Sequence, residues 1–213
     1  MTSKLHIVFD PLCGWCYAAS PFLRQLHQRF SETLPVEFHP GLLFAQASTI
    51  PHAYREHIIA ADKRIAALSG VTFGKAYLDK VARAAELRYW SVPASAAVMS
   101  QAQADTGTAL SLLEKIQHAH YVEALDVSDL TVLSKLAQEL GVQHDVFMSD
   151  YVRSSAALPG QAELAHQLLQ RVGASGFPSF ILEKDSQLLR LDHGGAYQHP
   201  EPLLAEIARH LPH

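Results

Sequence analysis

The spacing of apolar and polar residues changes twice along the chain. Residues 4–9 form a short apolar run that stops at Asp10-Pro11, which predicts a buried strand ending in a turn. Over residues 16–30, apolar positions recur every three or four residues, which predicts an amphipathic helix. Residues 35–39 alternate apolar and polar before the Pro40-Gly41 breaker and predict a second strand.

The middle of the chain has a different pattern. Residues 51–155 are helical in period almost throughout, with stop signals such as Gly70 and Gly141. A further helix over 161–172 leads to a strand entered through Pro178. Residues 187–191 resemble the returning strand of a hairpin, and 201–211 predict a closing amphipathic helix.

This order predicts an α/β unit of four strands and three helices that is interrupted by a helical block. We expect two domains: a discontinuous α/β domain formed by residues 1–48 and 157–213, and an inserted all-helical domain formed by residues 49–156.

Composition narrows the function classes. The chain has 213 residues, 48% hydrophobic content and a formal net charge of −4, so it is globular and lacks the basic excess that binds phosphate backbones. Nucleic acid is therefore excluded as an expected partner. No apolar stretch approaches the ~20 residues of a membrane span, and the first residues lack a signal-peptide core, which predicts a cytoplasmic protein with no membrane partner.

The two cysteines, Cys13 and Cys16, carry the candidate chemistry. In a reducing compartment such a close pair is more often catalytic, redox-sensing or metal-binding than a structural crosslink. They lie where the first strand meets the first helix, and free N–H groups at a helix start favour a thiolate. We expect Cys13 to be the exposed attacking thiol and Cys16, one turn later, to resolve the mixed disulfide.

Two other interpretations compete with exchange chemistry. A zinc site needs four ligands, but the chain has no second cysteine pair and no HExxH motif, so we expect neither a metal nor another cofactor. The second alternative is that the two cysteines are incidental core residues.

The segment from Phe9 to Tyr17, which includes Cys13-Gly14-Trp15-Cys16, resembles the active-site turn of DsbA-like thioredoxin-fold proteins. The resemblance is to the FrnE-type cytosolic branch, whose members are described as protein disulfide isomerases. Residues 124–137, 176–180 and 194–195 also match, in order. The resemblance implies a thioredoxin-like fold with a large inserted helical domain, and an oxidoreductase acting on protein or peptide thiols. One departure is Gly14, where this branch usually has proline.

The resemblance also implies roles for individual residues. Pro178 should be cis and face the cysteine pair, and the Phe177 backbone should offer strand-like hydrogen bonds to an extended substrate. Trp15 is a candidate substrate contact. Asp10 is a candidate proton acceptor for Cys16, although a turn-forming role is an equal alternative.

The sequence leaves several functions open. Oxidase, reductase and isomerase are not distinguished, and glutathione is a further candidate partner. Related kappa-class glutathione transferases and hydroxychromene-carboxylate isomerases have serine at the position of Cys13, so a glutathione-dependent transferase or isomerase is the second hypothesis. The third is a non-catalytic peptide-binding holdase.

Overall fold

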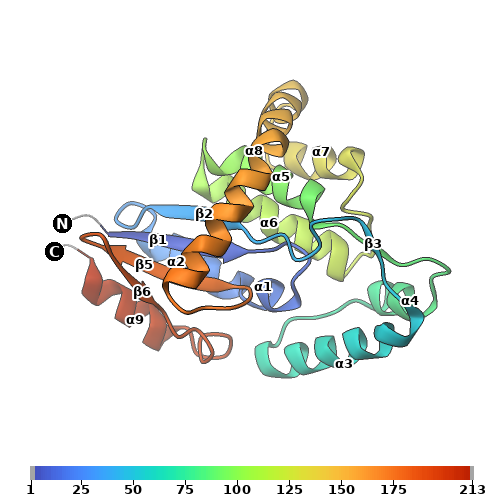
Figure 1. Ribbon diagram of the computed structural model, residues 1–213, viewed down its shortest axis with the longest axis horizontal. Helices are drawn as coiled ribbons and strands as arrows, with labels where there is room; N and C mark the ends of the chain where they lie inside the picture. Colours follow the sequence, from blue (N-terminus) through green and yellow to red (C-terminus); the bar gives the residue numbers. More distant parts are fainter. Residues whose placement is uncertain (1–2, 212–213) are drawn as a thin grey trace.

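A four-stranded mixed sheet lies at the centre of the computed structural model, which describes residues 3–211 (Figure 1). Its strands are β1 (Ser3–Phe9), β2 (Val36–Pro40), β5 (Ser179–Lys184) and β6 (Gln187–Arg190). In the order β2-β1-β5-β6, β1 and β2 are parallel and the other neighbours are antiparallel. The sheet therefore joins the two ends of the sequence, as the strand pattern predicted.

Helices fill the connections and the long middle of the chain. Two short strands, β3 (Ser48–Thr49) and β4 (Arg88–Tyr89), pair within this middle part and had no signal in the sequence pattern. The helices are α1 (Gly14–Ala18), α2 (Ser20–Phe30), α3 (His52–Ser69), α4 (Lys75–Arg83), α5 (Ser91–Ala102), α6 (Thr106–Tyr121), α7 (Leu130–Gln138), α8 (His144–Arg171) and α9 (Glu201–His210). None of the helices in residues 3–211 is both long and apolar enough to cross a membrane.

Both faces of the sheet are covered, because alternate residues of each strand point to opposite sides. On one face Phe180 of β5 packs edge-on against Phe22 of α2, with ring centroids 5.3 Å apart. On the other face Val8 and Ile181 pack against the last turns of α8, where Leu169 is buried. Figure 1 shows α8 crossing the sheet. Burial on both faces explains why β1 is almost continuously apolar.

The predicted helix over residues 16–30 is in fact two helices. α1 begins at Gly14, directly after Cys13, and α2 begins at Ser20. Pro21 occupies the first turn of α2, where its missing N–H costs nothing. The chain can therefore change direction at Ala19 while apolar residues on both sides of the break stay buried.

The predicted break before residue 161 is absent, because α8 runs unbroken through Pro159. A proline inside a helix removes one hydrogen bond and usually ends or kinks the helix. Here Leu158, Ala162 and Ala165 continue one buried stripe across the proline, and Pro159 itself is exposed. Packing of this stripe offsets the lost hydrogen bond.

The predicted domain boundary between residues 156 and 157 falls inside α8. One hydrophobic cluster also contains both sheet residues such as Ile7 and helical-block residues such as Leu112. The division into residues 1–48 with 157–213 and residues 49–156 stays a prediction.

Gly160 provides a test of the continuous helix. A β-carbon added at this exposed position would meet no atom within 4 Å. Glycine inside a helix is destabilising by roughly 0.5–1 kcal/mol relative to alanine, so we expect Gly160→Ala to raise the free energy of unfolding by about that amount. Urea denaturation should show a higher midpoint with an unchanged slope. A lower midpoint would contradict an unstrained helix at this position.

Candidate active site

The turn after β1 is organised by the carboxylate of Asp10. One oxygen, Oδ1, accepts a hydrogen bond from the Leu12 N–H at 2.7 Å, and Oδ2 accepts one from the Leu43 N–H at 2.7 Å. The Cys13 N–H donates to the Asp10 carbonyl at 3.1 Å. These contacts give Asp10 the turn-forming role, and they also bind the turn to the loop after β2.

Asp10 is fully buried, and this changes its acidity. Burial raises its pKa to about 6, while hydrogen bonds from Ser91, Leu43 and Leu12 act in the opposite direction. The Asp10 N–H, not its carboxylate, contacts Cys16, at 3.4 Å from Sγ. A proton-accepting role for Asp10 stays a prediction.

Cys13 and Cys16 lie 3.7 Å apart and are not bonded to each other. The thiol of Cys16 lowers the pKa of Cys13, and the N–H groups of Cys16 and Trp15 also lower it, against the effect of burial. Burial raises the pKa of Cys16 well above its usual value, and the neighbouring Cys13 adds to this effect. The two thiols are therefore electrostatically unequal, with the more easily ionised one at the start of α1.

Cys13 is less exposed than the sequence predicted, although it is more accessible than Cys16. Cys13 keeps 9% of its surface accessible and Cys16 keeps 2%. The cover over Cys13 comes partly from the loop before β5, whose Phe177 carbonyl accepts a hydrogen bond from the Cys13 thiol at 3.2 Å. The Phe177-Pro178 peptide bond is cis, so the predicted conformation and the predicted position beside Cys13 are both found.

The Phe177 side chain has a support that the sequence did not reveal. Its ring packs directly on Gly41, where an added β-carbon would lie 2.1 Å from ring atom Cε1. Gly41 is fixed on both sides: its N–H donates to the Phe9 carbonyl at 2.7 Å, and its carbonyl accepts from His166 Nε2 at 2.9 Å. The Pro40-Gly41 breaker was visible in the sequence, but its packing partner, which is more than a hundred residues away, was not.

A groove of about 470 Å³ opens next to the cis-proline loop. Trp15 lies at its edge and packs against Tyr197, with ring centroids 5.1 Å apart. Phe177 and Pro178 also line the groove, so the structure brings together three of the predicted binding residues. Tyr197, like the other lining residues Arg190 and His193, was missed; the Gly194-Gly195 signal marked only the segment.

Gly14, the departure from the related turn, has a packing explanation. α3 lies against the start of α1, and a β-carbon at residue 14 would be 2.8 Å from Ile65 Cδ1 and 3.3 Å from Asp62 Oδ1. Glycine therefore permits the close approach of α3. The carboxylate of Asp62 accepts a hydrogen bond from the Tyr77 hydroxyl at 2.9 Å, and burial raises its pKa to about 6.

A family model described as a DSBA-like thioredoxin domain matches residues 4–195. This chain belongs to the DSBA-like thioredoxin family. Membership confirms the predicted thioredoxin-like fold with a helical insertion and the predicted oxidoreductase class of enzyme. A search among curated proteins found no match.

Solved structures extend this finding. Our DSBA-like protein is 35% identical to the cytosolic disulfide reductase DsbM from Pseudomonas aeruginosa, with 97% of both chains covered and a TM-score of 0.85. The glutathione complex of that reductase matches at 33% identity, with 97% of this chain and 98% of that chain covered and a TM-score of 0.84. A 2-hydroxychromene-2-carboxylate isomerase matches at 14% identity, 97% and 96% coverage and a TM-score of 0.58, which shows a shared fold.

Gly41→Ala tests the support under Phe177. Because the added methyl group overlaps the ring, we expect a loss of about 1–3 kcal/mol in the free energy of unfolding and a changed alkylation rate at Cys13. Gly195→Ala is the matched control, since a β-carbon there meets nothing within 4 Å. Urea denaturation and timed iodoacetamide labelling measure the two effects. Wild-type values for Gly41→Ala would show that Phe177 does not depend on this contact.

Asp10→Asn tests the buried carboxylate through pH. The folded-state pKa of Asp10, about 6, exceeds its unfolded value of about 3.9, so folded protein binds more protons between these values. Asp10 therefore stabilises the folded state at low pH. This contribution to the free energy of unfolding, up to about 3 kcal/mol, is lost as pH rises through 6.

Asparagine cannot accept hydrogen bonds at both ends, so the variant should be less stable than wild type at pH 4. The deficit should shrink by pH 7, where ionised Asp10 destabilises wild type. Urea denaturation across this range measures the difference. A deficit that grows with pH would contradict the raised pKa.

Proposed function

We propose that this protein reduces disulfides by thiol-disulfide exchange, with Cys13 as the attacking thiol and Cys16 as the resolving thiol. The observation that carries the proposal is the environment of Cys13: its sulfur lies at the start of α1, its pKa is lowered, and it contacts the Phe177 carbonyl beside the groove. Attack requires a thiolate, and Cys13 forms one more easily than Cys16.

The proposed cycle balances two electrons. The Cys13 thiolate attacks a substrate disulfide, forms a mixed disulfide and releases the first substrate thiolate, which takes up a proton. Cys16 then loses its proton and attacks the Cys13 sulfur, which releases the second substrate thiol and leaves a Cys13-Cys16 disulfide. Two molecules of a small thiol return the pair to the dithiol and become a disulfide themselves.

Asp10 is proposed to assist the resolving step. Cys16 is buried, with a raised pKa, and needs a nearby base when it attacks. Asp10 is buried beside it and has a pKa of about 6, which suits a group that takes up and returns a proton near neutral pH.

Glutathione is the proposed small thiol. The DsbM reductase has been crystallised with glutathione, and our protein has a groove of about 470 Å³ lined by Phe177, whose carbonyl contacts Cys13. Trp15, Phe177 and Pro178 provide apolar contacts, and Arg190 places a positive charge on the groove wall. The backbone at Phe177 is proposed to pair with the extended peptide. The same relative supports a cytoplasmic location.

Cysteine at position 13 argues against the transferase and isomerase alternative, and the likeness to the isomerase at 14% identity extends to the fold alone. The choice of reductase over oxidase or isomerase rests on likeness to DsbM at 35% identity. An equilibrium potential measured in glutathione buffers would test this choice, because a strongly oxidising pair would favour the oxidase.

We expect Cys13→Ser to abolish reduction of a glutathionylated peptide, because the attacking thiolate is gone. Cys16→Ser should instead accumulate a peptide or glutathione adduct on Cys13, since nothing resolves it. Mass spectrometry of quenched reactions measures adducts, and circular dichroism checks that both variants fold. Brief alkylation of wild type should label Cys13 before Cys16. Wild-type turnover in Cys13→Ser would rule out the assignment, and an adduct on Cys16 would reverse the two roles.

A further inference from the structure

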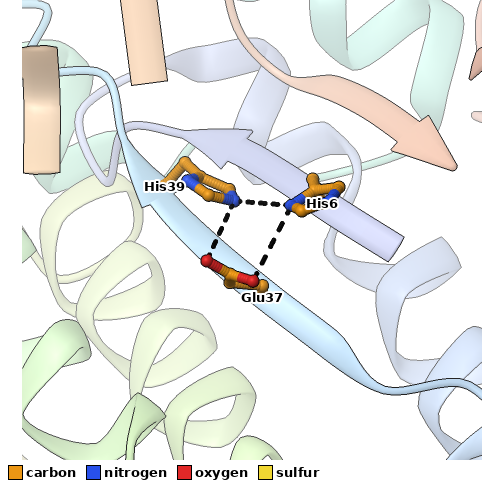
Figure 2. A group of neighbouring side chains, drawn as sticks. All are labelled: His6, Glu37 and His39. Atoms are coloured by element: carbon orange, nitrogen blue, oxygen red, sulfur yellow. Dashed lines mark hydrogen bonds and ion pairs between the residues drawn. The ribbon is translucent and has the colours of Figure 1, made fainter. Parts of the chain in front are cut away.

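Three polar side chains converge on one face of the sheet, in a group that the redox chemistry does not use. His6 comes from β1, and Glu37 and His39 come from β2 (Figure 2). Glu37 and His39 are two residues apart and so share a face of their strand, and the parallel register places His6 opposite Glu37. Among residues 3–211 this is the one group with enough neighbouring donor atoms for a metal ion.

The donor atoms of this group are close together. His6 Nδ1 lies 2.8 Å from His39 Nε2, Glu37 Oε1 lies 3.8 Å from His39 Nε2, and Glu37 Oε2 lies 3.9 Å from His6 Nδ1. In a tetrahedral zinc site with bonds of about 2.0–2.1 Å, ligand atoms are roughly 3.3 Å apart. The observed separations lie on both sides of that value. The 2.8 Å contact is a hydrogen bond from His39 Nε2 to His6 Nδ1, so enclosing an ion requires small side-chain rotations and transfer of the His39 proton to its Nδ1.

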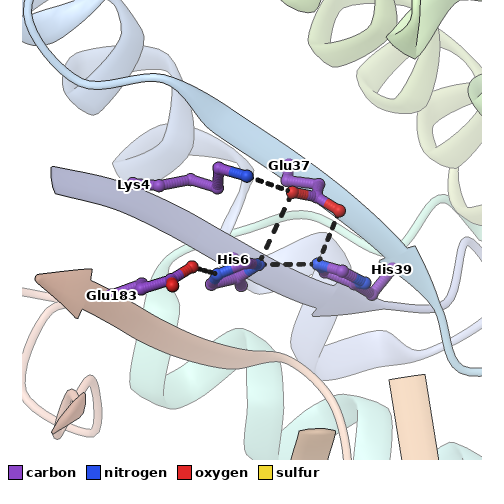
Figure 3. A network of polar contacts seen from close by, with 5 residues as sticks. All are labelled: Lys4, His6, Glu37, His39 and Glu183. Atoms are coloured by element: carbon purple, nitrogen blue, oxygen red, sulfur yellow. Dashed lines mark hydrogen bonds and ion pairs between the residues drawn. The ribbon is translucent and has the colours of Figure 1, made fainter. Parts of the chain in front are cut away.

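Outer contacts of the kind that orient metal ligands are already formed (Figure 3). Glu183 on β5 accepts a hydrogen bond from His6 Nε2 at 2.9 Å, which leaves Nδ1 of a neutral His6 with its lone pair toward the group. Lys4 donates to Glu37 Oε2 at 2.8 Å and leaves Oε1 free. Ligating histidines almost always donate their other N–H to such a partner, and ligating carboxylates are held in the same way.

Charge and access also suit a cation. With neutral histidines, the two glutamates and Lys4 give these five side chains a net charge of −1. The His6 and His39 side chains are 9% and 13% exposed, whereas Glu37 is 48% exposed. Water can reach the group from the side of Glu37.

We propose that His6, Glu37 and His39 bind a divalent ion of the zinc class, with water as the fourth ligand. Two imidazoles and one carboxylate form a ligand set that zinc uses. The ion would join edge strand β2 to β1. Along the sheet, His6 and Glu37 lie level with Ile181 of β5, and His39 lies level with Ser179. The sequence predicted no metal because the chain has no second cysteine pair to complete a zinc site with the first pair, and because it has no HExxH motif. Here His6 lies 31 positions before Glu37, so sequence spacing gave no signal.

The test uses the full chain with both cysteines replaced by serine, so that thiolates cannot bind the metal. Zinc is titrated in competition with a chromophoric chelator, and we expect one equivalent per chain. His39→Gln and Glu37→Gln should each weaken binding at least tenfold, and Glu183→Gln should weaken it by about 10–100-fold. His118→Gln is the matched control, because His118 is exposed and forms a single histidine–glutamate pair, 3.3 Å from Glu123. The affinity of this control variant for zinc should equal that of the serine variant.

Absence of stoichiometric zinc binding in the serine variant would overturn the proposal. It would also be overturned if His39→Gln and Glu37→Gln both bound zinc as tightly as the serine variant without them. Glu37 is half exposed, so Glu37→Gln keeps the test valid if the buried histidine variants fail to fold. Cobalt gives a second measurement: without the cysteines its visible spectrum should be that of a nitrogen and oxygen site, with no thiolate charge-transfer band. Because these variants lack the thiols, the result is independent of the proposed exchange activity.

Discussion

The buried carboxylate of Asp10 is the contact on which the geometry of the site depends. Its two oxygens bind N–H groups from two segments, the cysteine turn and the loop after β2. An unpaired carboxylate in this position would be costly, so both segments are held where its oxygens can be satisfied. The start of α1, and with it Cys13, is thereby fixed relative to β2.

The same loop carries the other half of the site. Gly41 lies two residues before Leu43 and lets the Phe177 ring pack against the backbone. The Phe177 carbonyl then meets Cys13. Asp10, Gly41 and Phe177 thus connect three parts of the chain around one sulfur atom. The inequality of the two thiols follows, because Cys13 lies among hydrogen-bond donors at a helix start while Cys16 is enclosed.

The sequence pattern predicted those features that depend on interactions between residues close together in the chain. The apolar run of β1 and the position of the cysteines at a strand-to-helix turn were readable because each involves neighbouring residues. The cis bond at Pro178 and its place beside Cys13 came from resemblance, since no local rule links residues so far apart. The position of Tyr197 in the groove could not be read from the sequence, because an aromatic residue that follows two glycines can also lie in a loop with no binding role.

Two further features could not be decided from the sequence, for physical reasons. Helix α8 continues through Pro159 because tertiary packing on its buried stripe outweighs the intrinsic preference of proline. For Asp10, the sequence offered a turn role and a proton-accepting role, and only the positions of Leu12 and Leu43 showed that its oxygens bind two backbone segments. Both depend on contacts that form after the chain has folded.

The separation of Cys13 from Phe177 by 164 residues also matters during synthesis. At about 5–20 residues per second, a ribosome needs roughly 10–30 s to extend the chain from the first of these residues to the second. During that time β1 and β2 have no third strand to pair with, and Cys13 has no carbonyl beside it. Until residue 177 is added, the Cys13 sulfur lacks the cover and the hydrogen bond that the loop before β5 provides in the finished chain.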